Sequence, residues 1–303
     1  MKYVSSCLLT GLILLNLNNC LAQKSHSYEI TPPDKHYKIL GKLNPASNPQ
    51  RAWMDTIYFP WSEYGKGALS YSIYRTIYLS PEDERKIDQL AKSLLPANSS
   101  DQCKAEMDYL MKLLKDRSTK DIEKSEAIAR IGSWVVLNPF DSYNSKNLSN
   151  LFYIAQPVGE WFNPANFPAV TNLLNKTIRD IRITEFRLKK EFRRPRPRHL
   201  DDKIENSIDS PAYPSGHTLF AYTQAYLFSE IIPSMRQTFL EKAEEVRWSR
   251  EVLGIHYPSD NEASRQIAGL LMELWMNNPE FTKDVEDAKK EWKEKSVKYN
   301  KMQ

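Results

Sequence analysis

The sequence predicts an all-α protein built as a single helical-bundle domain. Apolar residues recur every three or four positions through most of the chain, which is the spacing of one helix face. Only nine glycines interrupt the 303 residues, and a serine followed by a proline, a signal that begins helices, precedes one of the periodic segments. The hydrophobic content of 41% is ample for a core. The chain shows no internal repeat and no interdomain linker, so we expect one domain.

Residues 1–22 have the pattern of a signal peptide. Lys2 precedes a short apolar core over residues 7–15, and Ala22 is the small residue that signal peptidase requires. Cleavage after Ala22 would make the protein periplasmic or secreted, with Cys103 as its one remaining cysteine and no intramolecular disulfide. Lipidation at Cys20 is an alternative, although the residues before it match that signal poorly. No segment after residue 22 is long enough to span a membrane.

Residues 23–66 are predicted to form an irregular N-terminal arm, followed by the helical domain over residues 67–303. Five prolines between positions 32 and 60 disfavour regular structure there. We expect the arm to be pinned to the domain by its aromatic residues, Trp53, Tyr58, Phe59, Trp61 and Tyr64.

The first half of the domain carries three helix signals. Ser80-Pro81-Glu82-Asp83 reads as a cap, a first-position proline and acidic residues in a first turn. Apolar stripes at helical spacing follow over residues 107–114 and 122–135. Residues 138–150 are rich in Asn and Ser and are predicted to be a loop.

Five helices are expected in the second half. A stripe from Leu174 to Phe192 predicts a long helix that ends near Arg194-Pro195. Residues 217–232 are apolar nearly all round and stop at Pro233, which indicates a central, buried helix. Residues 239–253 and 263–276 predict two packed helices, and the charged tail over residues 282–302 predicts a solvated one.

Three short segments carry most of the chemistry: Lys189-x6-Arg196-Pro197, Pro214-Ser215-Gly216-His217 and Ser249-Arg250-x5-His256-x3-Asp260. Their three cations suit the oxygens of a phosphoryl group, whose transfer is catalysed mainly by positioning and electrostatic stabilisation. The glycine allows close approach of the backbone, and Ser215 is placed to cap a helix whose free N–H groups bind anions. Two histidines can divide the roles of nucleophile and general acid, and Asp260 can orient His256.

Local patterns support this interpretation. Arg250 falls on the apolar stripe of its helix with Phe239, Ala243 and Val246, and a buried arginine requires an anionic partner. A bound phosphate would supply one. Pro258 is placed to begin a helix, so His256 is expected just before that helix and Asp260 in its first turn.

The three segments resemble the type 2 phosphatidic acid phosphatase (PAP2) superfamily, which also includes vanadium haloperoxidases. Within it the chain is most similar to bacterial class A non-specific acid phosphatases. The likeness extends to Tyr213–Thr218, Gly254–Asp260 and the tail segment Asn278–Phe281, over roughly residues 170–295.

This resemblance implies a helical bundle and a phosphomonoesterase that works through phosphohistidine. His256 would be the nucleophile, Asp260 its orienting partner and His217 the general acid. The phosphate would be held by Lys189, Arg196, Ser215, Gly216 and Arg250. The family needs no metal or other cofactor for this reaction, and the sequence shows no competing metal-ligand motif such as H-E-x-x-H. The expected partner is a small phosphorylated substrate, and a homo-oligomer is left open.

Each motif alone has a simpler interpretation. Pro-Ser-Gly-His can be a helix cap, a His-x3-Asp pair can be a surface contact, and the arginine run allows a second register, Arg187-x6-Arg194. Residues 181–198 hold eight Lys/Arg and two Glu, yet they lack the interleaved Tyr or Trp that stacks on bases, so we expect no nucleic-acid partner. A vanadium-dependent haloperoxidase and a phosphatase of lipid phosphates or diphosphates remain alternatives, as does a basic nucleic-acid-binding protein without enzymatic activity.

Overall fold

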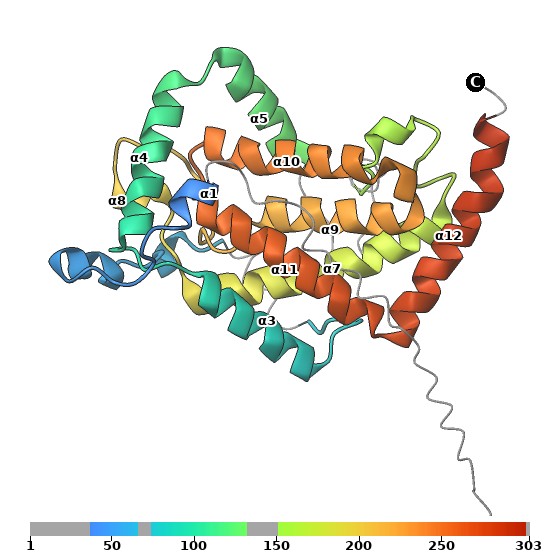
Figure 1. Ribbon diagram of the computed structural model, residues 1–303, viewed down its shortest axis with the longest axis horizontal. Coiled ribbons are helices and arrows are strands. Elements are labelled where there is room, and N and C mark those ends of the chain that lie inside the picture. The colour runs from blue at the N-terminus through green and yellow to red at the C-terminus, as the bar shows by residue number, and fades with distance from the viewer. Residues whose placement is uncertain (1–36, 66–73, 132–150, 301–303) are drawn as a thin grey trace, which may run out of the picture.

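A computed structural model describes residues 37–65, 74–131 and 151–300. No strand occurs within these ranges, and the all-α prediction is confirmed (Figure 1). The α-helices are α1 (Tyr37–Leu40), α3 (Pro81–Leu94), α4 (Asp101–Asp116), α5 (Thr119–Ile131), α7 (Pro168–Phe192), α8 (Pro197–Leu200), α9 (Gly216–Ile231), α10 (Arg236–Val252), α11 (Pro258–Met276) and α12 (Pro279–Asn300). Short 3₁₀ helices are η2 (Pro49–Thr56), η3 (Trp61–Glu63), η5 (Gln156–Val158) and η6 (Pro233–Met235). The predicted signal peptide and the 138–150 loop lie outside the described residues.

Helix α9 is the centre of the molecule, as its apolar sequence predicts. It lies between α10 and α11, with α7 and α12 also against it (Figure 1). All its side chains are buried except those of His217 and Glu230. Two of its inner hydroxyls are satisfied within the helix: Thr223 Oγ1 donates to the carbonyl of Leu219 at 2.7 Å, and Ser229 Oγ donates to that of Ala225 at 2.6 Å. The helix ends at Ile231, two residues before Pro233.

Helix α7 confirms the predicted long helix. Pro168 opens it, and the stripe from Leu174 to Leu188 is buried. It ends where Arg193 adopts a left-handed conformation, φ 45°, with its N–H bonded to the carbonyl of Lys189 at 3.0 Å. This turn carries the chain back across the helix ends, so that Arg194 and Arg196 are both buried.

The start of α3 also follows the sequence. Ser80 Oγ accepts from the N–H of Asp83 at 3.2 Å, and the Asp83 carboxylate accepts from the N–H of Ser80 at 3.0 Å. This reciprocal cap satisfies two backbone donors that the helix itself leaves without acceptors.

Helix α4 buries part of its predicted apolar stripe together with a polar side. Of its apolar stripe only Leu110 is fully buried, whereas Gln102, Cys103 and Glu106 are buried beside it. The polar side is buried because Glu106 forms an ion pair with Arg194, and a buried arginine requires a negatively charged partner.

The prediction of a solvated C-terminal helix is wrong for one face of α12. Phe281, Val285 and Ala288 are buried, and Trp292 stacks on Trp161 with 5.6 Å between ring centroids. The Glu291 carboxylate also accepts from the N–H groups of residues 169 and 170 at 2.9 and 3.1 Å. It thereby caps the start of α7, which ties a charged helix to the body.

Four of the five aromatic residues named for the N-terminal arm contact the body. Phe59 and Tyr64 are buried, and the guanidinium of Arg193 lies 5.5 and 4.3 Å from the ring centroids of Tyr58 and Trp61. Trp53 is 66% exposed. The N–H of Phe59 donates to the carbonyl of Arg193 at 2.8 Å, so the arm is fixed where α7 ends. Across the described ranges, no helix has the length and apolar character that crossing a membrane requires.

Candidate active site

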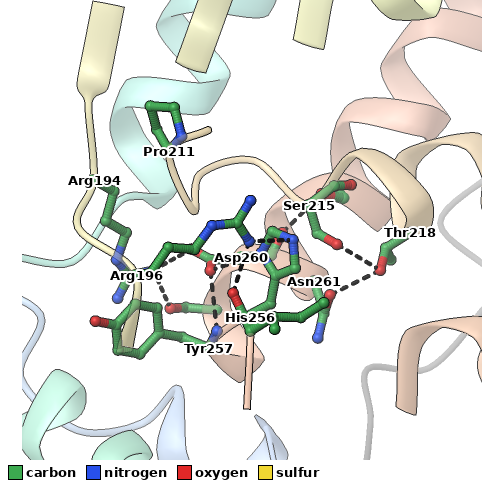
Figure 2. A network of polar contacts seen from close by, with 12 residues as sticks. Arg194, Arg196, Pro211, Ser215, Thr218, His256, Tyr257, Asp260 and Asn261 are labelled. Carbon is green, nitrogen blue, oxygen red and sulfur yellow. Dashed lines mark hydrogen bonds and ion pairs between the residues drawn. The ribbon is translucent and has the colours of Figure 1, made fainter. Parts of the chain in front are cut away.

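The three motif segments meet at one end of the central helices (Figure 2). Lys189 comes from the last turns of α7, and Arg196 stands just before α8. Ser215 and Gly216 begin α9, while Arg250 lies in the last turn of α10. His256 and Asp260 lie on either side of the start of α11, as expected from Pro258 at its first position. The site is therefore built from helix ends.

His256 is held from both sides. Its Nδ1 lies 3.1 Å from Asp260 Oδ2, and its Nε2 lies 2.8 Å from Arg196 Nη1 (Figure 2). A guanidinium can only donate, so Nε2 must be the lone-pair nitrogen and Nδ1 must carry the hydrogen. Burial, followed by the charge of Arg196, lowers the pKa of His256 well below the ordinary value, while Asp260 acts in the opposite direction. The structure thus presents a neutral imidazole whose lone pair points toward the cations.

Arg196 and Lys189 are buried beside this nitrogen. Arg196 donates from Nε to the carbonyl of Ser210 at 2.8 Å and from Nη1 to the carbonyl of Ile255 at 2.7 Å. Lys189 donates from Nζ to the carbonyl of Pro211 at 2.5 Å. Burial, followed by the charge of Arg196, lowers the pKa of Lys189 to about 7. Two cations in so dry a place favour the arrival of an anion.

Arg250 is fully buried, as its place on the apolar stripe indicates. Its Nη2 donates to the carbonyl of Ser125 in α5 at 3.2 Å and to Ser249 Oγ at 2.8 Å. Nη1 is buried and has no hydrogen-bond partner among residues 37–65, 74–131 and 151–300. Burial, followed by the charge of Arg196, lowers the pKa of Arg250 to about 10, which places the two arginines within electrostatic range. A buried guanidinium nitrogen of this kind can donate to an anion without giving up a bond to the protein.

Ser215 and Gly216 fix the start of α9. Ser215 Oγ donates to Thr218 Oγ1 at 3.0 Å, and Thr218 Oγ1 donates in turn to Asn261 Oδ1 at 2.7 Å (Figure 2). Gly216 has no room for a side chain, because a Cβ there would lie 2.0 Å from Oε1 of Glu185. The first turn of α9 is thereby locked against α11 and against α7.

His217 lies on the other side of the site. Its Nε2 lies 3.2 Å from the carbonyl oxygen of Ala129 in α5, so Nε2 carries the hydrogen. Burial, followed by the charge of Arg250, lowers the pKa of His217 well below the ordinary value, and His256 adds a smaller effect. His217 therefore shares the pocket with these two residues without a direct bond to either.

Arg194 is the main site residue that the sequence did not reveal. Its Nη1 donates to Asp260 Oδ1 at 2.6 Å and to Ser259 Oγ at 2.8 Å, and its guanidinium lies 4.0 Å from the ring centroid of Tyr257. Burial alone would raise the pKa of Asp260, but the charge of Arg194, ahead of the bond from His256, lowers it to about 2.

Behind Arg194 stands Glu106 of α4. Its carboxylate lies 3.4 Å from Arg194 Nη2 and accepts from the N–H and the hydroxyl of Ser259 at 2.9 and 2.8 Å. Burial raises the pKa of Glu106 to about 7, against the lowering effect of Arg194. The only sequence signal for Arg194 was the ambiguous arginine run, and Glu106 had none.

Of the two possible registers of the arginine run, the structure agrees with Lys189-x6-Arg196. Lys189 and Arg196 face the pocket, whereas Arg187 forms an ion pair with Asp88 near the surface. Across the described ranges, no cluster of three His, Cys, Asp or Glu side chains is placed to hold a metal ion.

Comparison with known proteins identifies the same region. Residues 169–282, which contain every site residue predicted from the sequence, match the model of the PAP2 superfamily. The chain is 37% identical over 81 residues to a non-specific acid phosphatase of Providencia stuartii, covering 27% of this chain and 33% of that protein. It is 29% identical over 134 residues to an acid phosphatase of Zymomonas mobilis, covering 42% and 51% of the two chains.

A third relative is a non-specific acid phosphatase of Salmonella typhimurium, 28% identical over 160 residues, which are 50% of this chain and 64% of that protein. The alignments thus span from a third to just under two thirds of these relatives' own length. Residues 169–282 thus match the PAP2 superfamily, and the chain is similar at moderate identity to non-specific acid phosphatases over part of their length.

Proposed function

We propose that this protein is a phosphatase that hydrolyses small phosphomonoesters through a phosphohistidine at His256, without a metal ion. The observation that carries the proposal is the fixed tautomer of His256: Nδ1 bonds to Asp260 at 3.1 Å, while Nε2 faces Arg196 at 2.8 Å. An imidazole held in this way has its nucleophilic lone pair beside the cations that would receive a phosphoryl group.

In the first step the Nε2 lone pair attacks phosphorus, and the bond from phosphorus to the ester oxygen breaks. Arg196, Lys189 and Arg250 hold the equatorial oxygens together with the free N–H groups at the start of α9. Arg196 Nη1 must turn from Nε2 to a phosphate oxygen as the substrate enters. Asp260 keeps Nδ1 in place and stabilises the positive charge that develops on the ring.

His217 donates a proton to the leaving oxygen, which departs as an alcohol. In the second step it takes a proton from water, whose oxygen attacks the phosphohistidine and returns His256 to its starting form. To reach the substrate, His217 exchanges the carbonyl of Ala129 for the ester oxygen. Its lowered pKa means that the protonated acid is formed mainly under acidic conditions.

The relatives bear the printed names acid phosphatase and non-specific acid phosphatase. Homology and the shape of the site support the same reaction class in this chain, a phosphoric monoester hydrolase. We also propose export to the periplasm or the medium, on the pattern of residues 1–22 alone. Mass spectrometry of the mature protein tests this, because cleavage after Ala22 leaves Gln23 as the first residue.

The test of the chemistry is a screen of phosphomonoesters with and without EDTA, combined with trapping of the phosphoenzyme. We expect wild-type turnover to survive EDTA and to yield an acid-labile, base-stable phosphoenzyme that His256→Ala lacks. Turnover by His256→Ala at the wild-type rate would exclude the assignment. Loss of activity in EDTA that zinc or magnesium restores would exclude the metal-free mechanism.

A further inference from the structure

One buried acidic residue of the pocket has no part in the proposed reaction. Glu185 lies one turn before Lys189 on the inner side of α7, and its side chain is 5% exposed. Its Oε2 accepts from Arg182 Nη1 at 2.6 Å, and its Oε1 lies 3.9 Å from Lys189 Nζ. The charge of Glu185 also acts on Arg196, whose pKa it raises against the larger effect of burial. An acidic group thus lies among the cations of the phosphate site.

The position of this carboxylate is defined by Gly216. A Cβ built on Gly216 would lie 2.0 Å from Oε1 and 2.6 Å from Oε2 of Glu185, so the carboxylate rests directly against the first residue of α9. The N-terminus of a helix attracts negative charge through its free N–H groups and its dipole. The Glu185 carboxylate therefore lies beside both the N-terminus of α9 and Lys189. These are two of the groups that would bind phosphate.

A phosphate bound there would meet this carboxylate at close range. Like charges in a dry site repel strongly, because little solvent screens them. The pocket can accept the substrate's phosphate only if Oε1 of Glu185 turns away from Lys189 and the start of α9. The bond from Arg182 to Oε2, at 2.6 Å, can hold the carboxylate while Oε1 moves.

We propose that Glu185 is a resident anion that competes with the substrate's phosphate for Lys189 and the N-terminus of α9, and so limits the affinity of the site. The proposal rests on the proposed phosphatase function, since it concerns the same pocket. It predicts an unusual result, namely that removing a buried charged residue from the active site strengthens ligand binding.

The experiment is isothermal titration of inorganic phosphate into wild type and Glu185→Gln at neutral pH. We expect the variant to bind phosphate roughly tenfold more tightly or better, because the amide keeps the size of the side chain without its charge. Glu262→Gln is the matched control. Glu262 is also buried in an ion pair with an arginine three residues along, at 2.5 Å from Arg265, and lies outside the pocket's cations. It should leave the phosphate affinity unchanged.

Thermal unfolding of each variant establishes that it is folded. Should Glu185→Gln prove unstable, Glu185→Asp keeps the charge for Arg182 but shortens the side chain by one methylene away from Gly216. Its phosphate affinity should exceed that of wild type. Equal or weaker phosphate binding by a folded variant would overturn the proposal for Glu185. If wild type itself neither binds phosphate nor hydrolyses phosphomonoesters, the proposed function fails instead.

Discussion

Replacement of Arg194 tests whether the charge network behind His256 acts on catalysis. Arg194→Met removes the cation that bonds to Asp260 at 2.6 Å and faces Glu106 at 3.4 Å. Methionine keeps much of the side-chain volume, so the change is mainly electrostatic. Both carboxylates then remain in the interior without a positive partner, in a place where neither side chain is exposed to solvent.

The cost in stability can be judged in two ways. Removing one partner of a buried ion pair typically costs about 3–5 kcal/mol. Asp260 has a pKa of about 2 against its ordinary 3.8, which corresponds to roughly 2–3 kcal/mol of stabilisation. Because the folded pKa is the lower one, this stability is complete above pH 3.8 and is lost as the pH falls toward 2. Glu106, with a pKa near 7, can take up a proton and reduces the loss. We expect about 3 kcal/mol at neutral pH.

Urea unfolding gives the stability, and single-turnover phosphorylation gives the rate. We expect Arg194→Met to slow phosphorylation about 10–100-fold, the range for residues that orient a reacting group through another residue. KM should change little, because Arg194 does not face the phosphate pocket directly. A purely structural role would not lower kcat while leaving KM nearly unchanged.

Arg187→Met is the matched control for this experiment. Arg187 belongs to the same arginine run and pairs with Asp88, but both side chains are partly exposed. Such pairs contribute about 0–1 kcal/mol, so the control should be nearly as stable and as active as wild type. Equal losses in both variants, or an unchanged phosphorylation rate in Arg194→Met, would refute the positioning role.

Three further outcomes are expected. Arg250→Ala should weaken turnover and vanadate inhibition together, each by about 10²–10³-fold; if both are unchanged in kinetic assays, Arg250 is only structural. His217→Asn should slow phosphorylation by alkyl phosphates about 10²–10⁴-fold and by p-nitrophenyl phosphate much less, and equal losses in rapid-quench measurements would exclude its role as acid. Wild-type phosphorylation should persist below pH 6.5, because the lowered pKa of His256 keeps its nucleophile neutral there; a rate that falls with the titration of an ordinary histidine would contradict this.

The sequence was sufficient where local chemistry decides the structure. The apolar spacing and the prolines at positions 81, 233 and 258 predicted helix starts and a helix end that the structure contains. The position of Arg250 on an apolar stripe predicted a buried side chain, and Arg250 is buried. Each of these signals is read within a few turns of one helix.

The sequence was insufficient where a residue's surroundings come from distant segments. Glu106 is buried because it meets Ser259, which lies 153 positions further along the chain. The charged tail of α12 packs because Glu291 meets the start of α7, 122 positions earlier. A charged side chain in an amphipathic helix is expected to face solvent unless a partner is available to it in the interior. Which partner that is depends on the tertiary fold and cannot be seen in the local sequence.

The carbonyl oxygens that accept hydrogen bonds from the site residues could not be predicted from the sequence for the same reason. The motifs name the donors of the site, but in the structure four of these side chains already bond to carbonyl oxygens of the protein, although Arg250 Nη1 has no partner among the described residues. These carbonyls belong to Pro211 for Lys189, to Ser210 and Ile255 for Arg196, to Ser125 for Arg250 and to Ala129 for His217.

Phosphate binding is therefore largely an exchange of acceptors, in which neutral carbonyl oxygens give way to charged phosphate oxygens. Such an exchange gains little from the number of hydrogen bonds and much from charge, because bonds to an ionised acceptor are roughly twice as strong as neutral ones. Changes of charge at Glu185 or Arg250 should accordingly alter affinity more than the loss of any one neutral contact around the pocket.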